Sequence, residues 1–418
     1  MRVYLLLLLP MMLFSRGVDL RTLIEHAATH NGNIKAKTLA VSAKSKEVES
    51  AQRAYWPTLD VGADYSWYSP NYLVSPGEVG NAYVSLNLDL YDGGRKAATV
   101  RAKRFEKEAS RFEKEAFSKS VTLEIVRRYY TVKKLLADLK ALAERGKELS
   151  AQIVRIRKFK LTGLATQEDV DKLQAVLDNN SYTTQNTRLA LETARENLKL
   201  LTGLDVAHLA SDHFISPSHV RFEWFDLIKQ MDARAKSIGA NAEALDAAYL
   251  PQVKFSDTYT RSHYGDQVAF GGFLGINGDT FLVDHQNVVG VSVNMRLFDN
   301  GHIAKQSEAV RLQKMALRAQ ILQAKREQKM RFKLAGKNLH TLQAKLKSAK
   351  SALNAAKSTY VTVRKKFEAG IVDNIAFLDA LAQKTLTEAR YKETLYDNEI
   401  AKSLYYYYAG KEPKEFVR

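Results

Sequence analysis

One pattern of residues occurs twice in this chain. VSLNLDLYDGG, which ends at Gly94, is matched by VSVNMRLFDNG, which ends at Gly301, and these two glycines lie 207 residues apart. The same spacing separates two further pairs, Gly163 with Gly370 and Gly203 with Gly410. A spacing held over so long a stretch is not expected by chance. The sequence therefore predicts two tandem copies of one structural unit.

Each copy contains two segments in which apolar and polar residues alternate. The alternation runs over 59–67 and 84–90 in the first copy and over 253–256 and 289–297 in the second. A period of two predicts four β-strands, each with one apolar and one polar face. Strands of about ten residues are long enough to cross the wall of an outer-membrane barrel. A soluble β-sandwich shows the same alternation and remains the alternative.

The chain after each second strand predicts a very long helix. No proline occurs from Asp92 to Gly163 or from Asp299 to Gly370, and each stretch would span about 105 Å as an α-helix. Apolar residues follow alternating steps of three and four, which predicts coiled-coil packing. These residues are Ile125, Tyr129, Val132, Leu136 and Leu139, and, in the returning segment, Val170, Leu173, Leu177, Leu191, Ala194, Leu198 and Leu201.

Each strand-to-helix transition has an aspartate followed by a glycine. Asp92 and Asp299 are suitable helix N-caps, and Gly94 and Gly301 permit the bend from strand to helix. The segment 19–55 predicts one helix, about half as long as the helix that follows the strands.

The predicted fold class is mainly α with a small β part, in two repeats that each contain a β-hairpin and very long coiled-coil helices. We expect a signal peptide at 1–17, a first repeat at 18–203, a connector at 204–224 and a second repeat at 225–418. The first repeat would hold, after an initial helix, a hairpin at 58–91, a long helix at 92–161 and a returning helix at 166–201. Their counterparts in the second repeat lie at 252–298, 299–368 and 373–408. The Gly-rich segment 264–281 predicts an enlarged loop.

The first residues indicate export. MRVYLLLLLPMMLFSRG has one arginine and a short apolar run, which is typical of a secretory signal peptide. A retained N-terminal anchor is the alternative. No later stretch is apolar over about 18 residues, so any membrane crossing is expected to use strands.

The composition argues against several functions. The net charge is +17, but the basic residues are spread among 46 acidic ones, so nucleic-acid binding is not expected. The chain has no cysteine and none of the common catalytic motifs, so we predict no enzymatic activity and no cofactor. Two histidine sets are interpreted as polar surface and solvated loop rather than metal ligands: His26 with His30, and His208, His213 and His219. The run 405–408, four tyrosines, is interpreted as packing.

Five motifs together resemble the TolC family of outer-membrane export channels. They are YWPTLDVGADYSW, LNLDLYDGGR, FKLTGLATQEDVDKLQA, MRLFDNGH and KFEAGIVDNIAFLDALAQ, and they extend over nearly the whole chain after its first residues. The resemblance implies a homotrimer whose twelve strands form one barrel in the outer membrane of a Gram-negative bacterium. Its helices would continue the barrel as a tunnel through the periplasm. The implied partners are outer-membrane lipid, a periplasmic adaptor (membrane fusion) protein and an inner-membrane transporter of the RND or ABC type.

The resemblance also implies a constriction at the helix tips. By position, Asp169, Asp379 and Phe367 would form the periplasmic gate, and the turns at Gly163 and Gly370 would contact the adaptor. Val372 and Ala376 depart from the family pattern, where an arginine and an aspartate can occur. Asp169 has a simpler interpretation as a carboxylate at a helix start.

The residues alone already require an oligomer. Four strands cannot close a barrel, and open strand edges are not tolerated in lipid. A dimer gives eight strands and a lumen filled by side chains, whereas three chains leave a pore. Together with this requirement, the resemblance implies the exit duct of a tripartite efflux or type I secretion system, with a structural coiled-coil envelope protein as the alternative. The cargo is left open among small toxic compounds, metal ions and secreted proteins.

Overall fold

The chain folds into two compact units that do not coincide with the two sequence repeats. The computed structural model describes residues 17–72, 75–206, 208–218, 220–267 and 282–418. Unit 1 contains the described residues up to Thr38 together with 113–227 and 324–418, and unit 2 contains 39–112 and 228–323. Each unit thus combines matching parts of both repeats, so the repeat is a unit of sequence and not of folding. Residues 1–16 of the predicted signal peptide and most of the predicted enlarged loop lie outside the described residues.

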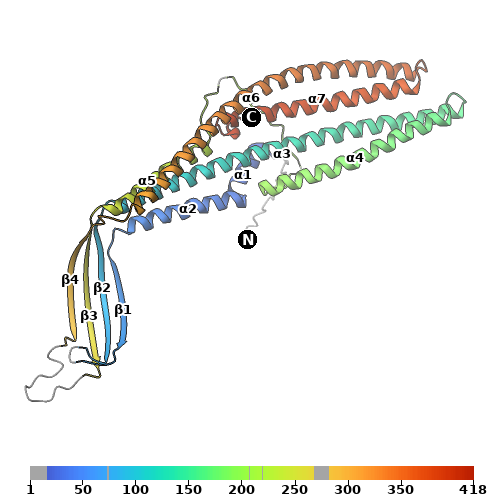
Figure 1. The fold of residues 1–418 in the computed structure, drawn as a ribbon. Helices are drawn as coiled ribbons and strands as arrows, with labels where there is room; N and C mark the ends of the chain where they lie inside the picture. Colours follow the sequence, from blue (N-terminus) through green and yellow to red (C-terminus); the bar gives the residue numbers. More distant parts are fainter. Residues whose placement is uncertain (1–16, 73–74, 207, 219, 268–281) are drawn as a thin grey trace, which may run out of the picture. The chain divides into compact units, whose positions relative to one another are not determined.

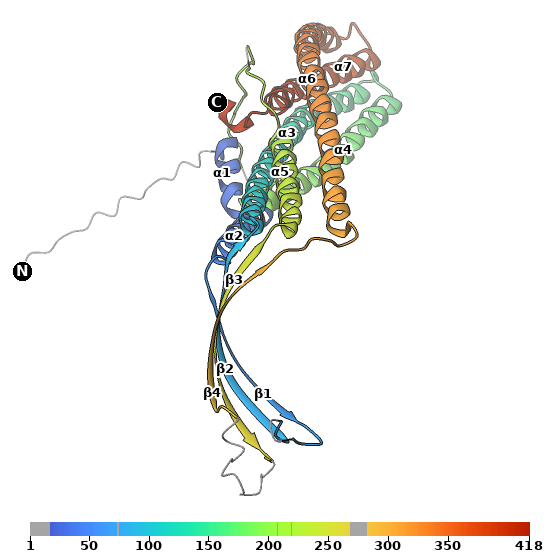
Figure 2. The same cartoon turned by 60° about the vertical axis from the view of Figure 1, so that its left-hand side comes forward.

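Unit 2 contains one antiparallel sheet built from both predicted hairpins (Figures 1 and 2). Its strands, in spatial order, are β1 (Thr58–Trp67), β2 (Glu78–Asp92), β3 (Gln252–Gly265) and β4 (His285–Asn294). The central pair, β2 and β3, joins the two repeats, while β1 and β4 form the edges. β4 ends three residues before the predicted Leu297, and residues 295–298 have no regular structure.

The strand register divides the side chains into two faces of opposite character. The apolar face carries Leu59, Val61, Val84, Leu86, Leu88, Phe255, Val289, Val291 and Val293, with Asp257 among them and with Glu78, Arg261, His263 and His285 toward its loop end. The polar face carries Asp60, Asp64, Asn81, Ser85, Asn87, Ser256, Thr258, Thr260 and Ser262. The alternation was expected to continue through Leu90. A register shift between Asp89 and Tyr91 instead leaves Leu90 unpaired and places Tyr91 opposite Val253.

Ion pairs join helices on the helical part of unit 2. α2 (Gly32–Arg53) and the start of α3 (Arg95–Leu161) share a network in which Lys44 Nζ lies 3.0 Å from Glu106 and Lys103 Nζ lies 3.0 Å from Glu47. These pairs are partly exposed, so each contributes at most about 1 kcal/mol. The second-copy counterparts are α5 (Asp226–Asp246), the short 3₁₀ helix η1 (Ala247–Tyr249) and the start of α6 (His302–Glu368).

Unit 1 is a helical bundle. It contains α1 (Leu20–His30), α4 (Gln167–Thr202), α7 (Asn374–Tyr408), the 3₁₀ helix η3 (Pro413–Phe416) and the rest of α3 and α6. α3 and α6 have 67 residues each and start and end 207 positions apart, as the repeat requires. None of the described helices is long and apolar enough to cross a membrane.

The single helix predicted over 19–55 is broken at Asn31, and that prediction was wrong. Asn31 is extended, with φ −69° and ψ 117°. Its backbone N–H donates to the Ala27 carbonyl, and its side-chain oxygen accepts from the N–H groups of Asn33 and Ile34 at 3.0 and 3.3 Å. One asparagine therefore ends α1 and caps α2, because its short amide competes with the helical backbone.

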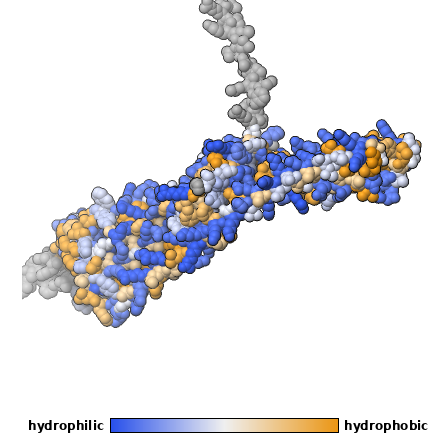
Figure 3. Space-filling view, turned by 90° about the horizontal axis from the view of Figure 1, so that it is seen from above, coloured by the Kyte–Doolittle hydropathy of each residue, from blue (hydrophilic) through white to orange (hydrophobic). Residues whose placement is uncertain are grey.

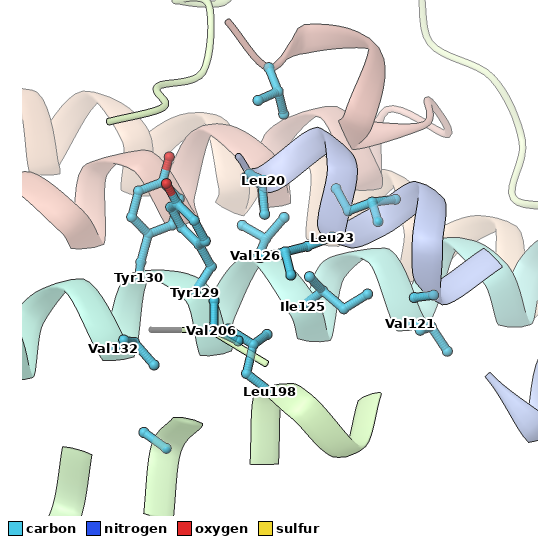
Figure 4. Close-up of a cluster of buried hydrophobic side chains, with 14 of the residues drawn as sticks. Leu20, Leu23, Val121, Ile125, Val126, Tyr129, Tyr130, Val132, Leu198 and Val206 are labelled. Carbon is cyan, nitrogen blue, oxygen red and sulfur yellow. The ribbon is translucent and has the colours of Figure 1, made fainter. Parts of the chain in front are cut away.

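The larger hydrophobic core of unit 1 confirms the predicted apolar seam (Figure 4). Ile125, Tyr129 and Val132 of α3 are fully buried and pack with Leu198 of α4. The residues Leu20 and Leu23 of α1 enter the same cluster. Burial raises the pKa of the Tyr129 phenol, whose hydroxyl donates to the Asp212 carboxylate at 2.7 Å.

The connector is not the solvated loop that was expected. Phe214 is 1% exposed, and its N–H donates to Glu399 at 2.6 Å while its carbonyl accepts from Lys402 at 3.0 Å. Glu399 and Lys402 form a buried ion pair with each other at 2.7 Å. These bonds fasten the connector to α7. The predicted packing of the tyrosine run is confirmed, since Tyr406 stacks on Phe416 with ring centroids 3.7 Å apart.

We predict that Leu198→Ala lowers the free energy of unfolding by about 2–5 kcal/mol, because it opens a cavity at a site with no exposed area. The matched control is Leu200→Ala in the same helix, whose side chain is 82% exposed in the single chain. Urea denaturation of the purified chain followed by circular dichroism checks both. Equal losses of unfolding free energy in the two variants would contradict the predicted burial of the seam.

Candidate functional site

The first strand-to-helix bend is held by the Asp92 carboxylate. Asp92 is 8% exposed, and its oxygens accept from the N–H groups of Gly94 at 3.1 Å and Lys96 at 2.7 Å. Gly93 and Gly94 both have positive φ, of 69° and 85°. A Cβ on Gly93 would lie 2.5 Å from the Ala247 carbonyl oxygen, so only glycine fits there. The bend therefore rests on Gly93 as much as on the predicted Gly94.

The second bend repeats this geometry with an added contact. Asp299 accepts from the N–H groups of Gly301 at 3.0 Å and Ile303 at 3.1 Å. The Tyr249 hydroxyl also donates to Asp299 at 2.9 Å. The chain turns here through Asn300 and Gly301, whose φ values are 55° and 76°. In both copies one carboxylate thus caps the start of the long helix.

Gly163 and Gly370 form the turns at the far ends of α3 and α6. Their φ values are 74° and 72°, and no atom lies within 4 Å of a Cβ built on either. The backbone N–H of Leu164 donates to Phe159, and that of Ile371 to Lys366, so both helices end in the same glycine-dependent motif. Hydrophobic residues are exposed at this end of unit 1 (Figure 3): Leu161, Leu164, Ile371 and Ile375.

Asp169 forms a reciprocal cap at the start of α4. Its carboxylate accepts from the Thr166 N–H at 3.0 Å, and its own N–H donates to the Thr166 hydroxyl oxygen at 3.1 Å. These hydrogen bonds to Thr166 hold the pKa of the Asp169 carboxyl below its ordinary value. The carboxylate therefore has a local structural role, which is the simpler of the two interpretations drawn from the sequence.

Asp379 has no such role. It lies within α7, beyond the first turn, and its side chain is exposed. The α7 cap is supplied instead by Asp373, which accepts from the Ala376 N–H at 2.9 Å. The two tips are in contact, since the Asn374 amide donates to the Asp169 carbonyl at 3.4 Å. The structure thus brings the starts of α4 and α7 together, with one carboxylate in a cap and the other facing solvent.

Phe367 is buried in a second hydrophobic cluster behind the tips. It is 5% exposed and stacks on Phe377, with ring centroids 4.9 Å apart. The cluster draws on all four long helices: Leu149, Ile153 and Ile156, Val170 and Leu173, Tyr360 and Phe367, and Phe377, Ala380 and Leu381. The partly buried Val372 packs against it. Within the single chain the Phe367 ring thus packs inside the bundle rather than at its surface.

Sequence reasoning missed the residues that hold the tip together. Tyr360 packs beside Phe377. Lys384 Nζ lies over the Tyr360 ring, 4.7 Å from its centroid. Arg155 of α3 donates to the Glu368 carbonyl at the end of α6. The aromatic residues that flank the Gly370 turn were a usable signal for Phe377. The Arg155 contact joins segments that are far apart in sequence, so no local sequence signal indicated it.

His26 and His30 contact each other and the backbone. His26 and His30 stack with ring centroids 3.7 Å apart, and His26 Nδ1 lies 2.6 Å from the Thr202 carbonyl oxygen. A group of three or more potential metal-ligating side chains does not occur within residues 17–72, 75–206, 208–218, 220–267 and 282–418. His219 lies outside the described residues.

The Asp169 cap predicts an acid-sensitive tip. Because its pKa is lowered by folding, the carboxylate stabilises α4 above its unfolded pKa of about 3.9 and loses that contribution as the pH falls below it. Thr166→Ala should cost about 1 kcal/mol, or roughly fivefold faster exchange in the first turn of α4. Hydrogen exchange, corrected for its intrinsic pH dependence, measures both effects. Thr183→Ala, in the middle of α4, is the control and should leave that turn unchanged.

Comparison with known proteins adds three findings. The sequence matches a family described as "Outer membrane efflux protein" over residues 23–204 and 226–404. A search of curated proteins gave no match. The fold is similar to three solved structures, each of which matches 94% of this chain. VceC from Vibrio cholerae has 16% sequence identity, a TM-score of 0.78 and 96% of its own chain covered. CusC has 16% identity, a TM-score of 0.79 and 93% of its chain covered, and CmeC from Campylobacter jejuni has 14% identity, a TM-score of 0.78 and 86% of its chain covered.

Proposed function

Because this chain belongs to the outer membrane efflux protein family, we propose that it forms a trimeric channel that is the exit duct of a tripartite efflux or type I secretion system. Its membership gives it an efflux role in the outer membrane, with extension into the periplasm. The trimer, the route of the cargo and the partners are the parts that we propose.

The observation that carries the proposal is the sheet of unit 2. It has one apolar and one polar face, and among the described residues both edge strands, β1 and β4, lack a partner on their outer side. The apolar face suits contact with lipid and the polar face suits a water-filled lumen. In lipid, the free edges must pair, so β1 of one chain would pair with β4 of the next. Three chains give twelve strands and an open lumen.

The long helices suit a tunnel that continues this barrel. α3 and α6 would each extend about 100 Å at 1.5 Å per residue. The exposed tip residues Leu161, Leu164, Ile371 and Ile375 form a hydrophobic surface that suits docking of a periplasmic adaptor at the Gly163 and Gly370 turns. The adaptor would in turn connect the channel to an inner-membrane transporter of the RND or ABC type.

The proposed constriction lies at the same tips. Asp379 is the stronger candidate because its carboxylate is exposed and free of capping, whereas Asp169 is engaged by Thr166. Phe367 would act through the packing of α6 on α7, since its ring contacts Phe377. In a trimer, three Asp379 carboxylates at a narrow mouth would attract cations, and charges more than about 8 Å away would be largely screened.

We predict that Asp379→Ala reduces cation selectivity and block by a trivalent cation added on the periplasmic side, with a smaller effect for Asp169→Ala. Single-channel recording measures both. Asp205→Ala removes an exposed carboxylate of the connector and is the control. If cation selectivity and block persist in both tip variants, the residues that select cations lie elsewhere in the channel. If the wild-type protein gives no conductance, the chain is a structural coiled-coil protein instead.

The sheet faces predict a further asymmetry. Leu88→Arg should reduce the yield of trimer strongly, because a charge at the lipid midplane costs about 2–4 kcal/mol, whereas Asn87→Arg should reduce it little. Light scattering of the detergent-purified protein, with circular dichroism to verify native strand content, gives the trimer fraction. A wild-type monomer with native strand content would overturn the oligomer, and equal effects would overturn the assignment of faces.

A further inference from the structure

The apolar face of the sheet has a hollow near its loop end. A cavity of about 640 Å³ lies toward the loop end of β1, β2 and β3, where Ala63, Gly80 and Ala82 form a floor of small residues. Tyr65, Arg261 and His263 stand at its sides. Asp64, Asn81 and Ser262, which lie between these rows, also line it, whereas the tyrosines of the adjoining polar-face rows, Tyr83 and Tyr264, do not. The hollow therefore opens on the face that we assign to lipid.

The strand register fixes the depth of this hollow. Arg261 pairs with Ala82 on one side and His285 on the other, and His263 pairs with Gly80. These rows follow the apolar rows and precede the loops. Tyr65 and Trp67, both well exposed, mark the same level on β1. Aromatic side chains at the end of an apolar band are typical of the boundary between hydrocarbon and headgroups. Arg261 and His263 therefore lie at the headgroup level of the outer leaflet.

The charges around the hollow leave one cation available. Among the described residues, Arg261 has no ion pair, although it interacts electrostatically with Asp284. The Asp284 carboxylate is already bound by His285 Nδ1 at 2.7 Å. Asp64, a carboxylate that also lines the hollow, accepts from the Asn81 amide at 2.9 Å, and Glu78 interacts with Tyr65. An exposed guanidinium beside an imidazole at this depth suits a phosphate group, which it can bind by two parallel hydrogen bonds.

We propose that this hollow binds a phosphorylated glycolipid of the outer leaflet, with Arg261 and His263 on a phosphate group and the lipid body against the floor of Ala63, Gly80 and Ala82. Small residues let a bulky headgroup approach the strands closely, as side chains of ordinary size would not. The proposal rests on the barrel described above, because only then does the apolar face meet lipid. It adds a specific lipid contact that the efflux role does not require.

The test uses the purified full chain in detergent, with lipid A and chemically dephosphorylated lipid A as probes. Native mass spectrometry counts the lipids retained by each trimer. We expect the wild type to retain lipid A in preference to its dephosphorylated form. Arg261→Gln should lower retention of lipid A roughly fivefold, and addition of His263→Gln should lower it further, since a basic residue near a lipid surface contributes about 1 kcal/mol. Lys254→Gln removes a positive charge from the polar face of the same strand and should change nothing.

Three results would overturn the proposal: equal retention of the two lipids, retention unchanged by Arg261→Gln, or an equal loss in Lys254→Gln. Conductance and trimer content of every variant are measured in parallel. If the variants form channels but retain lipid like the wild type, the lipid site alone fails. If the wild type forms no trimer or channel, the proposed function fails first.

Discussion

The backbone pairing of β2 with β3 determines how the rest of the chain is organised. It joins a strand of the first repeat to a strand of the second over the full length of both. One sheet with two edges results, in place of two isolated hairpins, which are marginally stable in water. The same pairing aligns the apolar rows of both hairpins on one face. The proposed lipid-facing surface, lumen and oligomer all rest on that alignment.

The tips show how two similar carboxylates acquire different roles. Asp169 stands three residues after a threonine at a helix start, and that spacing commits it to a cap. In the second copy Asp373 stands at the position of Thr166 and Ala376 at that of Asp169, so the cap is made by one side chain. Asp379 matches Lys172 of the first copy and lies beyond the cap, exposed to solvent. The repeat has diverged here without any change in the backbone.

Much of the fold was predictable because its signals are periodic. The limits of α3 and α6 fall within three residues of the expected ones, since caps and glycines mark them. Features that depend on one side chain were not predictable. Asn31 breaks a continuous helical pattern through its own amide, and the shift near Leu90 depends on strand pairing. The burial of Phe367 needs a partner, Phe377, across a turn. The connector appeared solvated because nothing local indicates that Glu399 and Lys402 bind its backbone.

The division into two units that each mix both repeats has a consequence for the origin of the chain. A single repeat contains only part of each unit, so a chain with one copy would have to assemble its folded parts from two chains. Two copies on one polypeptide raise the effective concentration of the parts to that of an intramolecular contact. Assembly of each unit then does not depend on dilution, and each copy can change alone. The connector, whose Phe214 N–H donates to Glu399 of α7, exists only where two copies are joined.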